Sequence, residues 1–262
     1  MEKLNKDRIA ILEYHGGDRY ENPDARGRID YYGLMAYPTA KFDGNAEIMG
    51  GWYGMVDSYL EIYDSLMQSH LSPCSLNIDV AYDFETRFVK VKSVTGATDS
   101  MQNAHLRYAI GESHIPGKWW GLDSLHHVVR KMLPDYSGVA LPTINNGDIY
   151  ADSQTCEIDS LWNDKNCYLV VFVQEDDPDK PVLRSAKYGP LAWVFGDVNG
   201  DGITNLPDLV RLANYIFKNA PAPDVLRRAD SNNDCTVDVA DIVYLTDYLF
   251  RSGPAPLKGC AR

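Results

Sequence analysis

The sequence has no apolar run near the roughly 18 residues that a membrane-spanning helix needs, and Met1–Lys6 lack the apolar core of a signal peptide. Basic residues are few: 25 Lys and Arg stand against 37 Asp and Glu, and the formal net charge is −12. This balance argues against binding to nucleic acid or to an anionic membrane surface, and it favours bound cations or a secreted protein. We therefore expect no nucleic-acid partner and no transmembrane segment.

The motifs that mark common catalytic centres are also missing. The chain contains no Cys-x-x-Cys pair and no His-Glu-x-x-His pattern. Three histidines, His114, His126 and His127, lie near Glu112 and Asp123 in the sequence, but histidines of loops and strands are more often structural than catalytic. We expect no catalytic residue in this chain.

Length and composition indicate a folded protein of several parts. A chain of 262 residues suits two or three domains, and 45% hydrophobic with 24% charged residues is typical of globular proteins. We expect an α+β protein with three segments, at residues 1–72, 73–192 and 193–262.

One internal repeat is clear, at an offset of 33 residues. Residues 197–208 (DVNGDGITNLPD) align with residues 230–241 (DSNNDCTVDVAD), and the match continues to Pro-Ala-Pro at 221–223 and 254–256. Repeats this close in the chain are duplicated supersecondary units.

Each copy carries oxygen side chains at the spacing of a calcium-binding loop. Ca²⁺ takes six to eight oxygen ligands, and a twelve-residue loop supplies them from positions 1, 3, 5, 9 and 12 and from the carbonyl at position 7. The expected ligands of the first loop are Asp197, Asn199, Asp201, Asn205, Asp208 and the carbonyl of Ile203. Those of the second loop are Asp230, Asn232, Asp234, Asp238, Asp241 and the carbonyl of Thr236. We predict two calcium sites, with Gly202 at position 6, where positive φ is favoured.

The loops, each followed by Leu-x-x-Tyr-Ile/Leu-Phe, resemble the repeats of type I dockerins. Position 12 is Asp rather than the Glu of ordinary EF-hands, and no amphipathic helix enters either loop. The resemblance implies a small all-α calcium domain over residues 193–262, with two antiparallel helices at Pro207–Lys218 and Ala240–Arg251. It also implies docking onto a cohesin partner outside the cell.

Two departures from the dockerin pattern affect these expectations. Positions 10 and 11 hold Leu206–Pro207 and Val239–Ala240, where cellulosomal dockerins commonly carry Ser-Thr-type pairs, so the partner is expected to be a cohesin-like or another surface protein. Cys235 stands where Gly is expected, and positive φ there costs on the order of 1 kcal/mol, which predicts a weaker second site. Cys235 and Cys260 either form a disulfide in an oxidising compartment or remain unpaired thiols.

The N-terminal segment predicts a strand at Arg8–Tyr14, a helix at Pro23–Tyr32, a strand at Thr39–Phe42 and an amphipathic helix at Tyr53–Ser69. Residues 32–44 (YGLMAYPTAKFDG) resemble a segment of thioredoxin-like proteins whose proline, here Pro38, is normally cis and lies beside the redox site. The wider pattern of residues 7–190 is similar to Omp28-related outer-membrane or secreted proteins of bacteria.

This second resemblance implies a partial thioredoxin-like α/β domain at residues 1–72. A thioredoxin fold opens with a strand and a Cys-x-x-Cys at a helix N-terminus, but no cysteine precedes Cys74. We therefore expect that the chain is truncated and that a signal peptide and any redox cysteines lay upstream. The alternative is a small domain that is complete in itself.

The middle segment predicts an antiparallel β-sandwich over residues 73–192. Its expected strands are Leu76–Tyr82, Phe88–Val94, Ala104–Gly111, Cys156–Leu161, Tyr168–Gln174 and Pro181–Ala186. Residues 115–121 and 126–132 are expected in two long connections. Cys156 and Cys167 flank a turn and either close a hairpin as a disulfide or stay free.

These observations predict a non-catalytic, secreted or cell-surface protein whose dockerin-like module binds two calcium ions and serves docking or anchoring. One alternative is an extracellular thiol-disulfide oxidoreductase truncated upstream of its Cys-x-x-Cys. Another is a polysaccharide-associated, cellulosome-like component.

Overall fold

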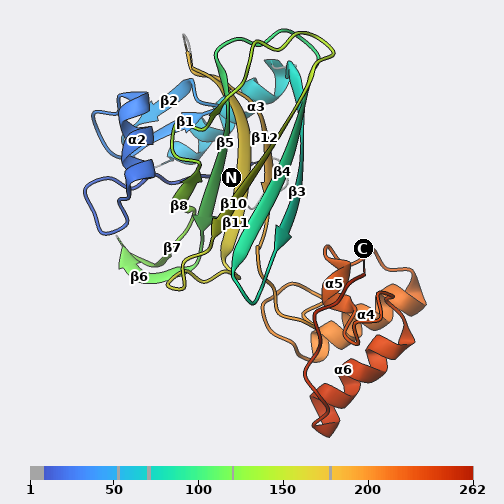
Figure 1. Cartoon of the computed structure of the whole chain (residues 1–262). Helices are drawn as coiled ribbons and strands as arrows, with labels where there is room; N and C mark the ends of the chain where they lie inside the picture. The colour runs from blue at the N-terminus through green and yellow to red at the C-terminus, as the bar shows by residue number, and fades with distance from the viewer. Residues whose placement is uncertain (1–8, 52–53, 70–71, 120, 177–178, 262) are drawn as a thin grey trace. The chain divides into compact units, whose positions relative to one another are not determined.

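The computed structural model describes residues 9–51, 54–69, 72–119, 121–176 and 179–261 (Figure 1). The chain forms two compact units, Met1–Leu191 and Ala192–Arg262. Antiparallel sheets and a few helices make up the first unit, and helices and loops make up the second. Among the described residues, no helix combines the length and the apolar character that a membrane span requires.

Two antiparallel sheets form the centre of the first unit. The smaller sheet has the strand order β10 (Ile149–Glu157), β4 (Phe88–Ala97), β3 (Cys74–Tyr82). The larger sheet has the order β12 (Val182–Tyr188), β11 (Cys167–Glu175), β5 (Ala104–Glu112), β8 (Val128–Leu133), and β9 (Val139–Ala140) pairs with the edge of β5.

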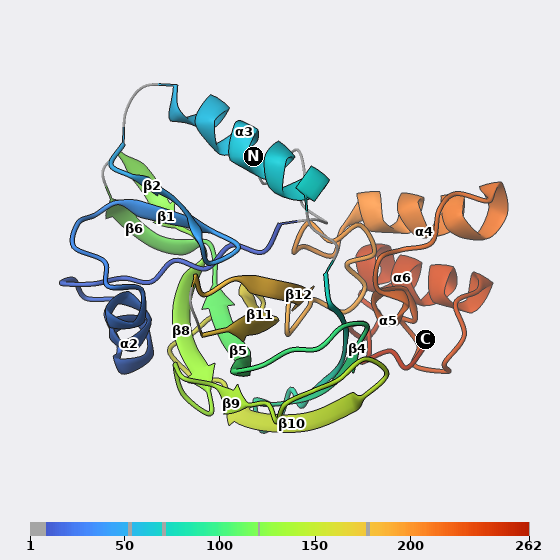
Figure 2. The same ribbon diagram turned by 90° about the horizontal axis from the view of Figure 1, so that it is seen from above.

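Strand β11 is covered on both faces, and its first seven residues, CYLVVFV, are accordingly a continuous apolar run. On one side the smaller sheet faces the larger one (Figure 2). The hydroxyl groups of Ser93 on β4 and Tyr108 on β5 lie 2.6 Å apart, and Tyr108 also donates to Asp152 on β10 at 2.8 Å. On the other side, Phe172 and its neighbours pack against Leu12 and other residues of the N-terminal segment.

Helix α2 (Pro23–Tyr32) confirms the predicted helix and packs beside β8. The Asn22 side chain accepts a hydrogen bond from the N–H of Ala25 at 2.9 Å, so it caps the helix start. The helix ends at Gly33, which takes the left-handed conformation with φ of 64°. From its buried face, Arg28 donates a hydrogen bond to Gln174 of β11 at 2.7 Å.

The predicted strand Thr39–Phe42 is present as β1, and it pairs with β2 (Ala46–Met49). The Tyr37–Pro38 peptide bond is cis. The predicted amphipathic helix is α3 (Met55–Ser69), while Tyr53, its expected first residue, lies outside the described residues.

The prediction of a strand at Arg8–Tyr14 is wrong for the residues that are described, from Ile9 onward. Only Glu13 forms a bridge, a parallel one with Val128. Its N–H donates to His127 at 2.7 Å, and its carbonyl accepts from Val129 at 2.9 Å. The apolar side chains of this segment instead cover the outer face of the larger sheet.

Three predictions for the middle segment are also corrected. The expected connections at residues 115–121 and 126–132 contain β6 (Ile115–Trp119), which pairs with β7 (Leu122–Leu125), and most of β8. The strand predicted at Cys156–Leu161 is the end of β10, which extends toward the N-terminus instead. Its exposed side chains give no apolar alternation.

The suggested Cys156–Cys167 disulfide does not form. Cys156 lies on β10 of the smaller sheet and Cys167 on β11 of the larger one. Both are free and buried, as is Cys74, and burial raises the pKa of each thiol. Buried thiols of raised pKa are poor nucleophiles.

In the second unit, both predicted helices are confirmed, as α4 (Leu206–Lys218) and α6 (Val239–Arg251). A single helical turn, α5 (Leu226–Ala229), precedes the second loop. The core of this unit consists of Val198, Leu212, Ala229 and Leu245. Leu212 and Leu245 occupy equivalent positions of the repeat, and both are fully buried.

Candidate metal sites in the C-terminal unit

The first loop, residues 197–208, turns its backbone around the carboxylate of Asp197, which is 2% exposed. Oδ1 of Asp197 accepts hydrogen bonds from the N–H groups of Gly200 at 2.8 Å and Asp201 at 3.0 Å. Oδ2 accepts one from Gly202 at 3.0 Å, which requires the left-handed turn at Gly202, with φ of 90°. The residue at position 1 is therefore held by the backbone of positions 4 to 6.

Asp208, at position 12, is fully buried in the first turn of α4. Its Oδ1 accepts from the N–H of Asn199 at 2.9 Å, and its Oδ2 accepts from the N–H of Asn205 at 2.8 Å. Carboxylate oxygens of Asp197, Asp201 and Asp208 all lie within 4.8 Å of one another. Burial raises the pKa of Asp208, and the neighbouring Asp197 and Asp201 carboxylates raise it as well.

The other expected ligands of this loop lie nearer its surface. Asn199 donates through its side-chain amide to Asp201 at 2.9 Å, and Asp201 Oδ1 accepts from the N–H of Ile203 at 3.0 Å. The side-chain oxygen of Asn205 is buried and has no partner at hydrogen-bonding distance and angle within the described part of the chain. A buried amide oxygen of this kind is available to a cation.

In the second loop, residues 230–241, the residue at position 12 is held in the same way as Asp208 in the first loop. Asp241 is fully buried, and its Oδ1 accepts from the N–H groups of Ser231 at 2.7 Å and Asn232 at 3.2 Å. Its Oδ2 accepts from the N–H of Asp238 at 2.9 Å. Burial raises the pKa of Asp241, and Asp230 contributes in the same direction.

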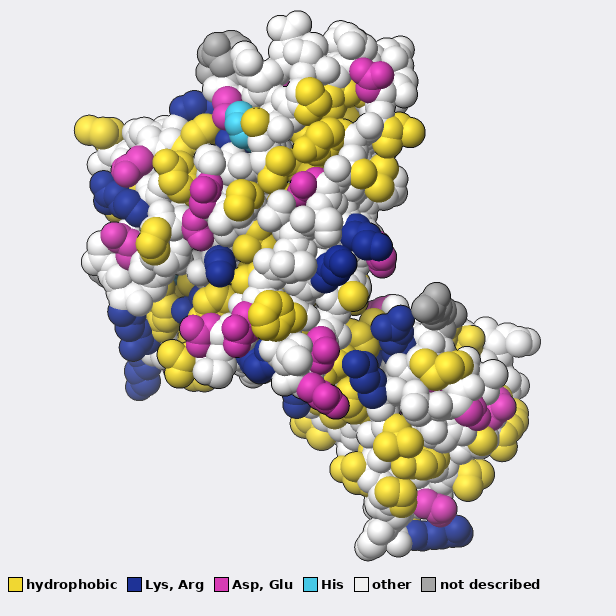
Figure 3. Space-filling view, in the orientation of Figure 1, with side chains coloured by type: hydrophobic (Ala, Val, Ile, Leu, Met, Phe, Trp, Pro, Cys, Tyr) yellow, Lys and Arg dark blue, Asp and Glu magenta, His cyan; other side chains and the backbone are white. Residues whose placement is uncertain are grey.

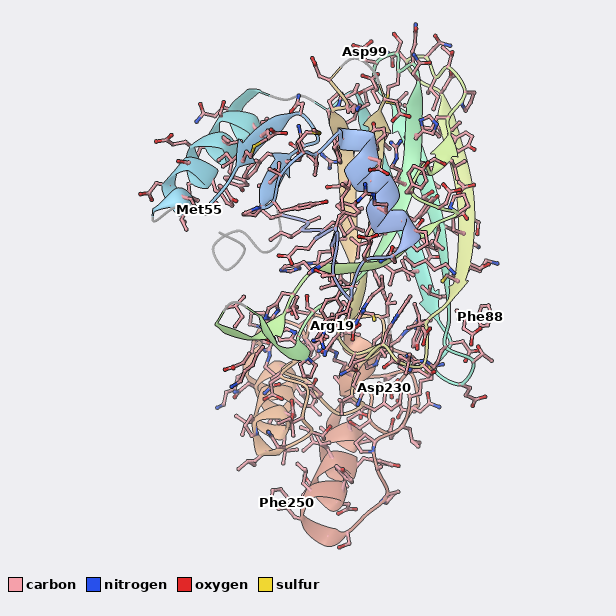
Figure 4. The ribbon with its side chains drawn as sticks, turned by 90° about the vertical axis from the view of Figure 1, so that its left-hand side faces the viewer. Arg19, Met55, Phe88, Asp99, Asp230 and Phe250 are labelled. Carbon is pink, nitrogen blue, oxygen red and sulfur yellow. A yellow bond between two sulfur atoms is a disulfide. The ribbon has the colours of Figure 1, made fainter. Side chains whose placement is uncertain are left out.

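Asp230, at position 1, is also fully buried and is labelled in Figure 4. It accepts from the N–H of Asp234 at 3.1 Å and of Cys235 at 3.2 Å. Asp234 is exposed, and hydrogen bonds from Thr236 lower its pKa. Asn232 donates to Asp234 at 2.8 Å, as Asn199 does to Asp201 in the first loop.

Cys235 and Cys260 form a disulfide, which confirms one of the two sequence alternatives. Cys235 has φ of 69°, so the residue at position 6 is left-handed in both loops. The disulfide places the chain end over Asp230, whose Oδ2 accepts hydrogen bonds from the N–H groups of Cys260 at 2.7 Å and Ala261 at 3.0 Å.

The equivalent place beside the first loop is occupied by Arg228. Its guanidinium Nη1 lies 3.9 Å from Asp197 Oδ2, and its carbonyl accepts from the N–H of Gly196 at 3.0 Å. A side chain at Gly200 would collide with this guanidinium, since a Cβ there would stand 2.7 Å from Nη1. Each position-1 carboxylate is thus covered by a different group.

The donor set of both loops fits a hard divalent cation. By residue type it consists of carboxylates and amides, whose oxygens Ca²⁺ prefers, and in the first loop three carboxylates lie within 4.8 Å of one another. In the second loop the residues found this close are Asp230, Cys235 and Cys260, and the two sulfurs are bonded to each other and so provide no thiolate. Buried carboxylates close together are costly without a positive charge. A calcium ion, when bound, would supply that charge. The carbonyls of Ile203 and Thr236 remain predicted ligands at position 7.

The comparison with protein families matches residues 195–250 to the dockerin type I domain. Residues 195–250 are a dockerin type I domain. None of the curated proteins matches the chain. Among solved structures, HBP35 of Porphyromonas gingivalis is similar, with 13% identity, 67% of this chain covered and a TM-score of 0.52, and the chain spans 61% of that protein's length. At this identity, the likeness concerns the fold alone.

A domain of the outer membrane lipoprotein Omp28 from Porphyromonas gingivalis is also similar, with 15% identity and a TM-score of 0.31. The match covers 44% of this chain and 93% of that domain. The dockerin domain itself lies within the second compact unit.

Sequence reasoning did not find the groups that cover the position-1 residues of the dockerin domain. Arg228 and Ala261 are separated by the 33-residue offset of the repeat, so extending the alignment past the loops would have pointed to both. The disulfide was expected, but the hydrogen bonds that it brings to Asp230 were not.

Three histidines of the first unit, His114, His126 and His127, contact one another or neighbouring hydroxyl groups. The rings of His114 and His126 pack edge to face at 4.6 Å, and His126 also lies 3.1 Å from the hydroxyl of Ser124. His127 Nδ1 lies 3.1 Å from the hydroxyl of Tyr168. These contacts place the three side chains in the β5–β8 region of the first unit.

Proposed function

We propose that the protein is a non-catalytic, secreted or cell-surface protein whose dockerin domain binds two calcium ions and docks or anchors the chain. The observation that carries this proposal is the group of three carboxylates, at Asp197, Asp201 and Asp208, whose oxygens lie within 4.8 Å of one another in a loop of calcium-binding spacing. The proposed ligands are the twelve residues predicted from the sequence. Calcium that binds only the folded domain stabilises it by linkage.

The docking role is supported by apolar residues that both copies of the repeat expose. Figure 3 shows apolar side chains on the surface of the second unit. Three pairs of apolar residues at the 33-residue offset are each between 48% and 64% exposed: Leu206 and Val239, Val210 and Val243, Phe217 and Phe250. Dockerin domains typically bind cohesins, so we propose a cohesin-like surface protein as the partner, recognised through apolar rather than hydroxyl contacts at position 10.

An extracellular or cell-surface location agrees with the disulfide of the dockerin domain and with the calcium range in which extracellular calcium modules work. Disulfides such as Cys235–Cys260 persist in oxidising compartments. Extracellular calcium modules work at dissociation constants of about 10⁻⁴–10⁻³ M, which intracellular calcium does not reach.

For the first unit, we propose an Omp28-related protein, with a partial thioredoxin-like domain at residues 1–72 and a β-sandwich at residues 73–192. The fold similarity to HBP35 supports this proposal. The two facing antiparallel sheets support the sandwich.

The test of the calcium proposal is isothermal titration calorimetry of the full chain. Two calcium ions are expected per wild-type chain, and one each for Asp197→Ala and Asp230→Ala. Asp99→Ala, which changes an exposed aspartate of the first unit, is the control and should still bind two. Absence of calcium binding by the wild-type protein at millimolar concentration would refute the proposal.

A further inference from the structure

The C-terminal tail, residues 252–261, returns to the second calcium loop and lies directly on its backbone. The N–H of Leu257 donates to the carbonyl of Ser231 at 3.0 Å. Gly259 is buried so tightly that a Cβ at this position would stand 2.2 Å from the carbonyl oxygen of Arg227 and 2.6 Å from that of Asp230. Only glycine fits at this crossing.

The tail determines which oxygen of the Asp230 carboxylate remains available to a cation. Oδ2 of Asp230 accepts three N–H groups, from Cys260 at 2.7 Å, Ala261 at 3.0 Å and Cys235 at 3.2 Å. A carboxylate oxygen has two lone-pair directions, so three donors saturate it. Oδ1 accepts from Asp234 at 3.1 Å and is the oxygen left to serve a cation.

The first loop has no such arrangement. Its position-1 residue, Asp197, accepts only one backbone N–H on Oδ2 within the described part of the chain, that of Gly202 at 3.0 Å. Arg228 stands where the second loop has Ala261, with its Nη1 3.9 Å from Asp197 Oδ2. The two loops share a ligand pattern and differ in what fixes their first ligand.

We propose that Cys260 and Ala261, held in place by the Cys235–Cys260 disulfide, are positioning residues of the second calcium site. They hold the Asp230 carboxylate with Oδ1 free to bind a cation. Because this ligand is already ordered, calcium binding costs less conformational entropy. Calcium affinity of the second site then depends on the disulfide, whereas that of the first site does not. The inference rests on the proposed calcium function.

Two variants of the full chain remove the tail from Asp230 in different ways. Cys260→Ser breaks the tether, and Gly259→Ala keeps both cysteines but drives the tail off the loop backbone. Calcium titrations by calorimetry, with amide NMR signals of Gly202 and Thr236 to assign the sites, give the affinity of each loop. In both variants, affinity at the second site should fall at least about tenfold, because two hydrogen bonds to a charged group are lost, and affinity at the first site should stay unchanged.

Unchanged affinity at the second site in both variants would overturn the inference and leave the calcium function standing. Equal losses at both sites would overturn it too, because the tail would then support the domain as a whole. If the wild-type protein binds no calcium, the proposed function itself fails. Hydrogen exchange of the calcium-free oxidised protein supplies a separate readout: the Cys260 and Ala261 amides should be protected, and rapid exchange would contradict the inference.

Discussion

Substitution of Gly202 by Ala is expected to weaken calcium binding at the first site through backbone strain alone. Gly202 has φ of 90°, and a Cβ added there would meet no atom within 4 Å, so the change introduces no collision. A non-glycine residue in the left-handed region costs about 1–2 kcal/mol. Since about 1.4 kcal/mol corresponds to a tenfold change, affinity should fall about 5- to 30-fold.

The loss should appear in the affinity because calcium selects the strained turn. The Gly202 N–H reaches Asp197 Oδ2 only in this conformation, and the ion needs Asp197 in place. Without calcium, the mutually repelling carboxylates of the first loop leave it free to relax, so the substitution then costs less.

Gly147 provides a matched control, because it has the same φ of 90° and no atom within 4 Å of a built Cβ, but belongs to the first unit. Gly147→Ala should lower the stability of the first unit without changing either calcium affinity. Calorimetric titration of the full chain measures both effects, with the second loop as an internal reference. Wild-type affinity at the first site of Gly202→Ala would refute this reasoning.

Three further predictions concern the same domain. Leu212→Ala and Leu245→Ala should each lower the unfolding free energy of the second unit by about 2–5 kcal/mol, since both side chains are fully buried. Thermal denaturation measures this loss, and a much smaller loss for either variant would contradict the assigned core. Reduction of the Cys235–Cys260 disulfide in the calcium-free protein should lower that free energy by about 3 kcal/mol, because the bond spans 25 residues, and chemical denaturation with and without reductant measures it. Calcium affinity should fall as pH is lowered toward the ordinary aspartate pKa of about 3.9. The pKa values of Asp208 and Asp241 are raised in the fold, so the calcium-free folded loops hold protons more tightly than the unfolded chain. Equal calcium affinities in titrations at about pH 7 and about pH 4 would contradict this prediction.

The direction of the pH effect follows from the raised pKa values of Asp208 and Asp241. Protonation of Asp208 and Asp241 stabilises the calcium-free fold fully below the unfolded pKa, and this stabilisation is lost as pH rises through the higher folded pKa. Calcium has to displace these protons, so the stabilisation by calcium should shrink in the same acidic window.

The dockerin repeat and helices α4 and α6 were predictable because the sequence signals that specify them are local. Each copy of the repeat contains these signals within about 20 residues: the spacing of the expected ligands, the residue at position 6 and the apolar stripe of the helix. Because the unit is duplicated, the same pattern occurs twice in the sequence. The covering groups lie outside these local windows, because Cys260 and Ala261 contact Asp230 from 30 and 31 positions away, and only the 33-residue offset of the repeat relates Ala261 to Arg228.

The sheets of the first unit show the same limit. Strand β11 was found because its first seven residues are apolar, as burial on both faces favours. Strand β10 was misplaced because most of its side chains are exposed or half-exposed, which leaves little hydrophobic pattern to read. Strand β8 was taken for a connection because a register shift at its pairing with β5 breaks the alternation of its buried residues.

The covering of the two position-1 carboxylates gives the two loops a different sensitivity to redox conditions. The first loop takes its cover, the guanidinium of Arg228, from the connection that leads into the second loop. The second loop takes its cover from Cys260 and Ala261, which the Cys235–Cys260 disulfide holds beside Asp230. A reducing environment would therefore release the cover of one loop and leave that of the other in place.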